Sequence, residues 1–150
     1  MQATLHRFAN HGPARPVPAA TNCVQWSGAS LSGATVWSEM GASDPDQYQS
    51  KAYVRDSADS PARSLGTVVT DTILACGNWI LWETRAVSNG AESYQIQRWR
   101  PGLDRPQRMY AGQPGVALTP MTCQAGTVYV EAAYLSSTPT YTETISATVT

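Results

Sequence analysis

The side chains that most often carry out chemistry are sparse in this 150-residue chain, and they are not grouped as a reaction requires. Its two histidines, His6 and His11, both lie in the first eleven residues. General acid–base catalysis near neutral pH most often uses histidine, and a metal site needs more converging ligands than this segment offers. Asp44 and Asp46 flank a proline, which is typical of a turn and lacks the spacing of an EF-hand. We therefore expect no enzyme activity, no cofactor and no metal.

Nucleophile and phosphate motifs are also missing. Residues 28–33 read Gly-Ala-Ser-Leu-Ser-Gly, which approaches the G-x-S-x-G nucleophile elbow but has Ser32 where the second glycine belongs. The chain has neither a P-loop nor a G-x-G-x-x-G sequence. This pattern favours a protein that works by binding.

The three cysteines, Cys23, Cys76 and Cys123, are too far apart for the C-x-x-C spacing of a zinc ribbon or a thioredoxin-like site. Two interpretations stay open. All three are buried, reduced thiols acting as small hydrophobic side chains, or one intrachain disulfide leaves a free thiol that could link subunits in oxidising surroundings. Cys23 and Cys76 bracket two tryptophans as in an Ig domain, but Leu74 replaces the tyrosine of the tyrosine corner.

Arginines cluster in the second half of the chain, where five of the ten cations fall between Arg85 and Arg108. Strand alternation places Arg98 and Arg100 on one face and Trp99 on the other. Arginine and aromatic residues bind single-stranded nucleic acid and are enriched at protein interfaces. Because the net charge is −1 and no nucleic-acid motif is present, we expect a protein interface. The candidate interface residues are Pro13, Arg15, Pro16, Arg98, Trp99, Arg100, Arg105 and Arg108.

An aromatic set offers a second kind of binding. Several tryptophans and tyrosines could form a platform on which sugar rings stack, although core packing would also explain them in a chain with one Phe. The residues concerned are Trp79, Trp82, Tyr94, Trp99 and Tyr110.

The composition indicates which elements must position these residues. Charged residues make up 14% of the chain, well below the roughly 25% of an average soluble domain. Thr, Val, Tyr and Trp are frequent and no long stretch repeats with the helical period, which favours strands. We expect an all-β fold, a single β-sandwich of jelly-roll or Ig-like type. No apolar run reaches 18 residues, so no membrane span is expected.

A β-hairpin is the strongest local prediction. Residues 78–86 and 92–100 flank Asn89-Gly90, which supplies the positive φ angles that a two-residue turn needs. Tyr94 and Ile96 alternate with glutamines, as expected of a half-buried strand. Further strands are expected at 22–27, 33–40, 48–55, 65–76, 127–135 and 140–149, with a long loop at 101–120.

The N-terminal segment differs from the rest. Residues 11–20 contain three prolines, which fix φ and remove hydrogen-bond donors. We therefore expect residues 11–20 to be extended and unable to sit inside a sheet, and residues 1–10 to form a short helical turn or an edge strand. Together, residues 1–21 would be an N-terminal arm that contacts a neighbouring chain, followed by the β domain at 22–150.

In its composition, its Pro-rich arm and its lack of an apolar leader, the chain resembles the small β-sandwich accessory proteins of tailed phages, the capsid decoration or cement proteins. The resemblance implies a structural protein of the virion that is made in the host cytoplasm without a signal peptide. It would be present in many copies or as a homo-oligomer, and would dock on capsid or tail subunits through its arm and its Arg/Trp-rich surface. The alternative is a carbohydrate- or host-surface-binding β-sandwich module.

Overall fold

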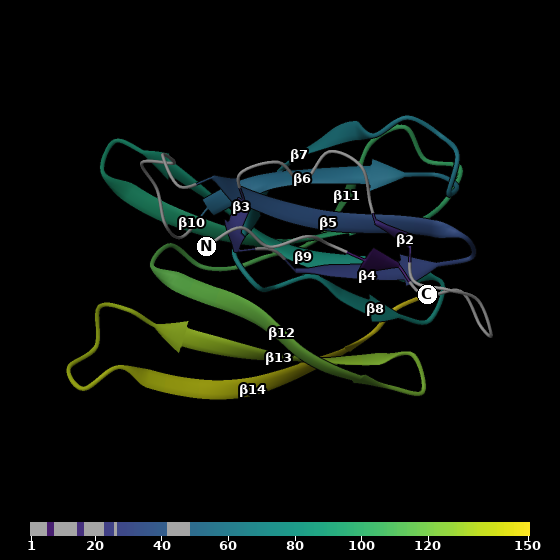
Figure 1. Ribbon diagram of the computed structural model, residues 1–150. Helices are drawn as coiled ribbons and strands as arrows, with labels where there is room; N and C mark the ends of the chain where they lie inside the picture. Colours follow the sequence, from purple (N-terminus) through teal and green to yellow (C-terminus); the bar gives the residue numbers. More distant parts are fainter. Residues whose placement is uncertain (1–5, 8–14, 17–22, 26, 42–48) are drawn as a thin grey trace.

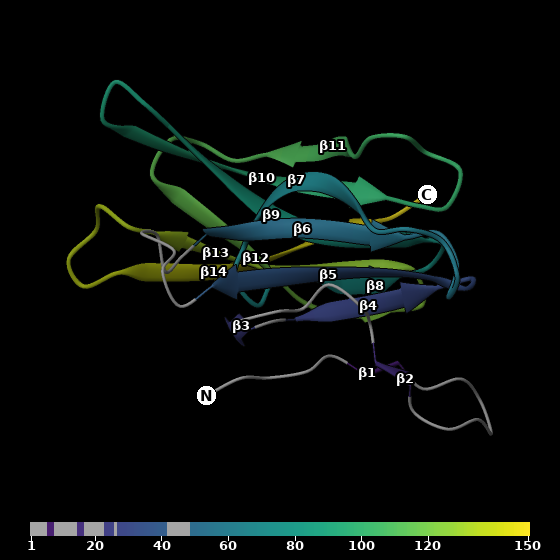
Figure 2. The same cartoon turned by 45° about the horizontal axis from the view of Figure 1, so that its top comes forward.

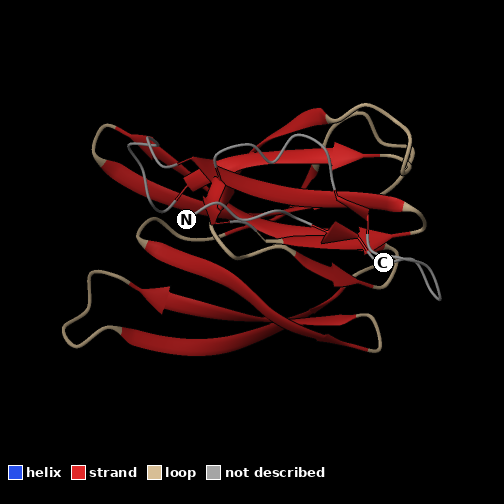
Figure 3. Ribbon diagram, in the orientation of Figure 1, coloured by secondary structure: helices blue, strands red, loops and turns tan. Residues whose placement is uncertain are grey.

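The computed structural model describes residues 6–7, 15–16, 23–25, 27–41 and 49–150, which form strands, turns and loops without a helix (Figure 3). The expected all-β class is confirmed. The strands of the first half are β1 His6–Arg7, β2 Arg15–Pro16, β3 Cys23–Gln25, β4 Gly28–Leu31, β5 Ala34–Gly41, β6 Gln49–Arg55 and β7 Arg63–Val69. Those of the second half are β8 Leu74–Cys76, β9 Trp79–Ser88, β10 Ala91–Trp99, β11 Gln107–Ala111, β12 Val116–Gln124, β13 Thr127–Tyr134 and β14 Tyr141–Thr148.

Three antiparallel sheets pack together. The first has the order β3-β5-β6-β7, with β4 also paired to β5, the middle one β11-β10-β9-β8, and the third β12-β13-β14. In Figure 1 the teal strands β8 and β9 lie between the blue strands β5 to β7 and the green and yellow strands β12 to β14. From β4 onward, strands that follow each other within a sheet are neighbours, so each sheet is built from local hairpins.

The middle sheet is covered on both faces. The apolar start of β9 alternates between two cores, because successive side chains of a strand point to opposite faces. Trp79 and Leu81 pack with residues of β12 and β13, whereas Ile80 and Trp82 pack with residues of β5, β6 and β7. All four are at most 4% exposed. Burial of such side chains contributes about 2 kcal/mol each, so β9 joins the two halves of the molecule.

The predicted hairpin is confirmed. Strands β9 and β10 pair antiparallel from Ser88↔Ala91 to Ile80↔Trp99, and Figure 2 shows them side by side. Asn89 and Gly90 have φ angles of 50° and 76°, as a two-residue turn requires. Tyr94 is buried on the same face as Ile96, as the alternation predicted.

One loop prediction and one strand prediction are wrong. Residues 101–120 are not one long loop, because they contain β11 and the start of β12. Pro120 fits within β12 because this strand is the edge of its sheet and has a register shift between Pro120 and Thr122. The single strand expected at 65–76 is divided into β7 and β8 by a turn at Asp71, whose φ is 62°. Strand β4 was not anticipated.

The expectation that residues 11–20 cannot sit in a sheet is wrong for Arg15 and Pro16. These two residues form β2, which pairs antiparallel with β1 as a separate two-stranded sheet. Both strands of such a ribbon are edges, so a proline can turn its missing donor outward. Pro13 and most of the predicted arm lie outside the described residues.

Gly90→Val should destabilise the protein. The space around Gly90 is open, with nothing within 4 Å of an added Cβ, so the cost comes from forcing a β-branched residue to a φ of 76°. We expect a loss of about 1–2 kcal/mol. This corresponds to a fall in the midpoint of thermal unfolding of roughly 3–6 °C for a domain of this size.

The matched control for this change is Ala91→Val, next to the turn in strand β10 and exposed. Valine suits a strand, so this variant should unfold within a degree or two of the wild type. Equal midpoints for Gly90→Val and the wild type would contradict the turn geometry.

Candidate functional site

Arg98 and Arg100 lie over one aromatic ring. Their guanidinium carbons are 4.2 Å and 4.7 Å from the centroid of Trp79, which is 4% exposed. Arg98 also donates through Nη1 to the main-chain oxygen of Thr150, at 3.1 Å. Strand alternation brings both arginines to the same face of the middle sheet. Stacking on an indole is a favourable cation–π arrangement, and it orders two long side chains that would otherwise be mobile.

No Asp or Glu side chain pairs with either arginine within the part of the chain that the structure describes. Arg63 with Asp56 and Arg85 with Glu92 are ion pairs elsewhere in that part of the chain. The Nε of Arg98 is buried without a hydrogen-bond partner among the described residues. The exposed guanidinium of Arg100 therefore keeps donors for an outside acceptor, whereas the buried Nε of Arg98 is not accessible to one. We call Trp79, Arg98 and Arg100 the arginine pair site.

Trp99 does not lie on the surface. It is fully buried in the core between the first and middle sheets, and its Nε1 donates to the carbonyl of Leu103 at 2.8 Å. Alternation had placed Trp99 opposite the arginines, and the first sheet covers that face. The aromatic residue that supports the arginines is Trp79, which sequence reasoning had assigned only to a sugar platform.

Arg105 and Arg108 are exposed but are not part of the same face. Arg105 lies in the loop between β10 and β11. Arg108 pairs with Gln97 and so projects on the opposite side of the sheet from Arg98, which pairs with Gln107. Arg15 and Pro16 form β2, but the structure does not describe their side chains. Pro13 lies outside the described residues.

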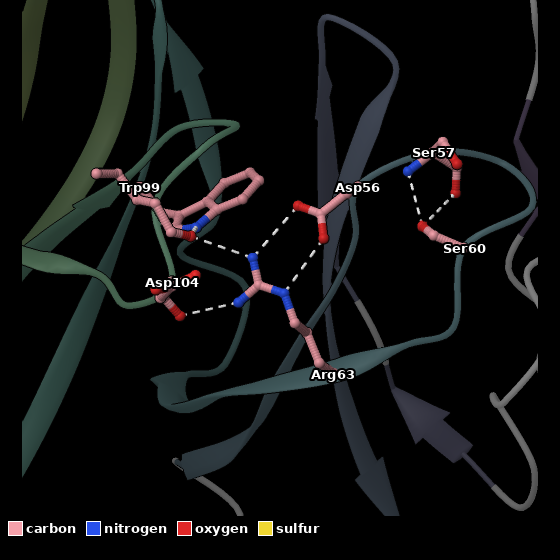
Figure 4. Close-up of polar contacts among 7 residues, drawn as sticks. Asp56, Ser57, Ser60, Arg63, Trp99 and Asp104 are labelled. Carbon is pink, nitrogen blue, oxygen red and sulfur yellow. Dashed lines mark hydrogen bonds and ion pairs between the residues drawn. The ribbon is translucent and has the colours of Figure 1, made fainter.

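An arginine that the sequence did not single out holds the loop after β10. Arg63 contacts both carboxylate oxygens of Asp56, at 3.2 Å and 3.3 Å. It also donates to the carbonyls of Leu103 at 3.1 Å and Asp104 at 2.9 Å, and lies 5.8 Å from the centre of the Trp99 ring (Figure 4). These contacts join residues about 40 positions apart in the sequence and hold the loop that follows β10 against β7.

A buried carboxyl lies where the middle and third sheets meet. Glu83 is 1% exposed, and it accepts hydrogen bonds from the amide of Leu118 at 2.7 Å and the hydroxyl of Thr119 at 3.4 Å. Burial raises the pKa of Glu83 from 4.5 to about 7, although both hydrogen bonds act in the opposite direction. A pKa near 7 suits acid–base catalysis, but this carboxyl has no access to solvent. It joins β9 to the free edge of β12.

A second polar group links β10 to β9. Glu92 bonds to Arg85, and it accepts a hydrogen bond from the hydroxyl of Tyr94 at 2.7 Å. The Arg85 bond, followed by the Tyr94 bond, lowers the pKa of Glu92. Burial and the bond to Glu92 raise the pKa of Tyr94 to about 12, with a smaller contribution from the charge of Glu83. At neutral pH Tyr94 is therefore a protonated donor.

The cysteines form one intrachain disulfide. Cys76 in β8 and Cys123 in β12 are bonded, with their Cα atoms 5.4 Å apart. The interpretation of three reduced thiols is therefore wrong for these two. Their pairing was not readable from the sequence, because it depends on which strands the fold brings together. The side chain of Cys23 lies outside the description, and its backbone pairs with Gly41.

The expected tryptophan platform for sugars is not on the surface. Burial removes four of its five members, because they fill the two cores between the sheets; these are Trp79, Trp82, Tyr94 and Trp99. Tyr110 is 47% exposed and remains accessible.

Comparison with known proteins gives no relative. No protein-family model matches the chain, and neither a curated protein nor a solved structure matches it. Within the described residues, no group of three or more His, Cys, Asp or Glu side chains is arranged to hold a metal ion. The described part of the chain contains no helix long and apolar enough to cross a membrane.

Stability should fall as the pH rises through 7. A carboxyl with a raised pKa in the folded state stabilises the protein fully below its unfolded pKa of 4.5, and this contribution is lost as the pH passes about 7. Urea unfolding should therefore give a free energy about 3 kcal/mol lower at pH 8.5 than at pH 4.5. Glu92, whose pKa is lowered, affects stability below this pH range. There its contribution to the stability of the folded protein decreases as the pH falls.

Glu83→Gln should remove most of this dependence, because glutamine keeps an acceptor for Leu118 and has no charge. Glu131→Gln, a change at a half-buried site on β13, is the matched control and should keep the wild-type slope. A wild-type stability that stays constant between pH 5 and 8 would refute the buried, protonated carboxyl.

Replacing both bonded cysteines by alanine should destabilise the protein by about 3–4 kcal/mol. The bond closes a loop with a sequence separation of 47, and its loss frees the unfolded chain. Chemical denaturation with and without a reducing agent measures this. Reduction should weaken the wild type and leave the Cys76→Ala/Cys123→Ala variant unchanged. An equal response of both proteins would show that this bond does not form.

Proposed function

We propose that the protein is a non-enzymatic structural protein of a virus particle, of the decoration or cement type found on tailed phages. It docks on capsid or tail subunits and stabilises the assembly, in many copies or as a homo-oligomer, without a cofactor. The observation that carries the proposal is the arginine pair site. Two guanidinium groups ordered by one indole, and without an Asp or Glu partner among the described residues, suit an acidic or carbonyl-rich surface on another protein.

The mechanism of docking follows from the stacking. A free arginine loses about 2 kcal/mol of side-chain entropy when it is fixed at an interface. Arg98 is already held by Trp79 and by the Thr150 oxygen, so less freedom is lost on binding. Arginine anchors of this kind are common among the residues that dominate interface energies. The predicted arm of residues 1–21 would supply a second attachment.

The finer architecture belongs to the same proposal. We interpret the packed sheets as a β-sandwich of jelly-roll or Ig-like type that carries an extended N-terminal arm. The support is the pair of cores on the two faces of the middle sheet. The location in the virion, with synthesis in the host cytoplasm, is compatible with the Cys76–Cys123 bond if the bond forms after release into oxidising surroundings.

Particles stripped of this protein and then titrated with purified variants test the docking role. Arg98→Ala/Arg100→Ala should bind with at least tenfold lower affinity, because both guanidinium groups are removed while the sheet remains paired. Lys51→Ala, which removes an exposed cation on β6, is the matched control and should bind like the wild type. Occupancy is read by co-sedimentation, and circular dichroism confirms the fold of each variant.

Equal binding by the double-arginine variant and the wild type would remove the arginine pair site from the proposal. Turnover of an esterase, glycosidase or peptidase substrate that is lost in Glu83→Gln would contradict the non-enzymatic assignment itself.

A further inference from the structure

Exposed aromatic and aliphatic side chains lie at one end of the third sheet. Among the described residues, Tyr141 is 56% exposed and Leu135 is 45% exposed, and both lie next to Tyr134. Tyr110, on the edge strand β11, is 47% exposed and lies close enough to contribute to the raised pKa of Tyr134. An exposed aromatic cluster of this kind differs from single scattered apolar residues, which need no explanation.

The two tyrosines form a fixed pair. Tyr134 ends β13 and Tyr141 begins β14, and they stand directly opposite each other in the register. Their ring centroids are 5.4 Å apart with the planes inclined by 45°. The hydroxyl of Ser137 donates to the carbonyl of Tyr134 at 2.8 Å and accepts from the amide of Tyr141 at 2.7 Å. This turn therefore fixes the spacing of the rings before any ligand arrives.

A carboxylate completes the cluster. Glu143 lies two positions after Tyr141 on β14 and so shares its face. Its Oε1 accepts a hydrogen bond from the hydroxyl of Tyr134 at 2.6 Å, and this bond is the largest cause of the raised pKa of Tyr134. Its Oε2 has no hydrogen-bond partner among the described residues. The cluster thus presents an aromatic face beside the carboxylate of Glu143, which is oriented by its hydrogen bond from Tyr134.

We propose that Tyr134, Tyr141 and Glu143 form a carbohydrate-binding site, in which a sugar ring stacks on Tyr141 and its hydroxyls donate to the free oxygen of Glu143. A pyranose has an apolar C–H face and equatorial hydroxyl donors, which match an aromatic ring next to a carboxylate. The proposal is independent of docking through the arginine pair site, which uses Trp79 and the strand β10.

The site differs from the platform expected from the sequence. That platform relied on tryptophans that pack inside the two cores. The side chains now assigned lie on β13 and β14, where the third sheet has an uncovered end. An acidic partner would be repelled by Glu143.

An array of immobilised neutral and acidic oligosaccharides, followed by calorimetry with the best-bound oligosaccharide, tests the proposal. The full-length wild type should bind at least one glycan. Tyr141→Ala should reduce the affinity about tenfold or more, Tyr141→Phe should retain most of it, and Glu143→Gln should reduce it severalfold. Met121→Ala removes an apolar side chain of similar exposure on β12 and should have no effect. Thermal unfolding confirms that each variant is folded.

Absence of binding to every glycan, or equal binding by Tyr141→Ala and the wild type, would overturn the proposal. Loss of glycan binding in Arg98→Ala/Arg100→Ala, with Tyr141→Ala unaffected, would also overturn it and would assign the glycan to the arginine pair site. If Tyr141→Ala instead lowers occupancy on the stripped particles and no glycan binds, the cluster is a protein contact.

Discussion

The burial of β9 on both of its faces is the constraint on which the rest of the structure depends. A strand covered on two sides can carry apolar residues at successive positions, and Trp79 to Trp82 do so with almost no exposure. Glu83 is the exception, because its carboxyl enters the same dry layer. The amide of Leu118 meets it there, so a donor on the free edge of β12 is paired with an acceptor from the middle sheet. The disulfide between β8 and β12 joins the same two sheets.

This layered arrangement determines which side chains remain for binding. Where the other sheets cover the middle sheet, its side chains are buried, as Trp82 and Trp99 are, whereas Arg100 at the end of that cover is exposed. Arg98 and Arg100 use a core residue, Trp79, as their support, so the stability of the core and the order of the surface arginines are linked. The pair of Tyr134 and Tyr141 likewise extends a face of β13 and β14 whose inner part is core. In both places buried core residues hold the exposed side chains in position.

Local features could be read from the sequence, because they depend on neighbours along the chain. Asn89-Gly90 and the alternation of Tyr94 and Ile96 identified the hairpin. The pairing of Cys76 with Cys123 and the burial of Trp99 could not be read, because alternation defines two faces of a strand without saying which sheet covers each. Pro120 concealed β12, since a proline is compatible with a strand only at an edge or a bulge. The contacts of Arg63 with Leu103 and Asp104 are equally invisible, because they span about 40 residues.

Native-state hydrogen exchange of the backbone amides tests the central claim that β9 is covered on both faces. Amides of a strand that opens only with global unfolding exchange slowest, whereas those of exposed edges exchange through local opening. The structure predicts that amides of Ile80 to Glu83 and their partners on β10 exchange slowest among the described residues, and that amides of the edge strand β14 exchange much faster. If the amides of β9 and β14 exchanged at similar rates, the middle sheet would not be a covered layer, and the account built on it would fail.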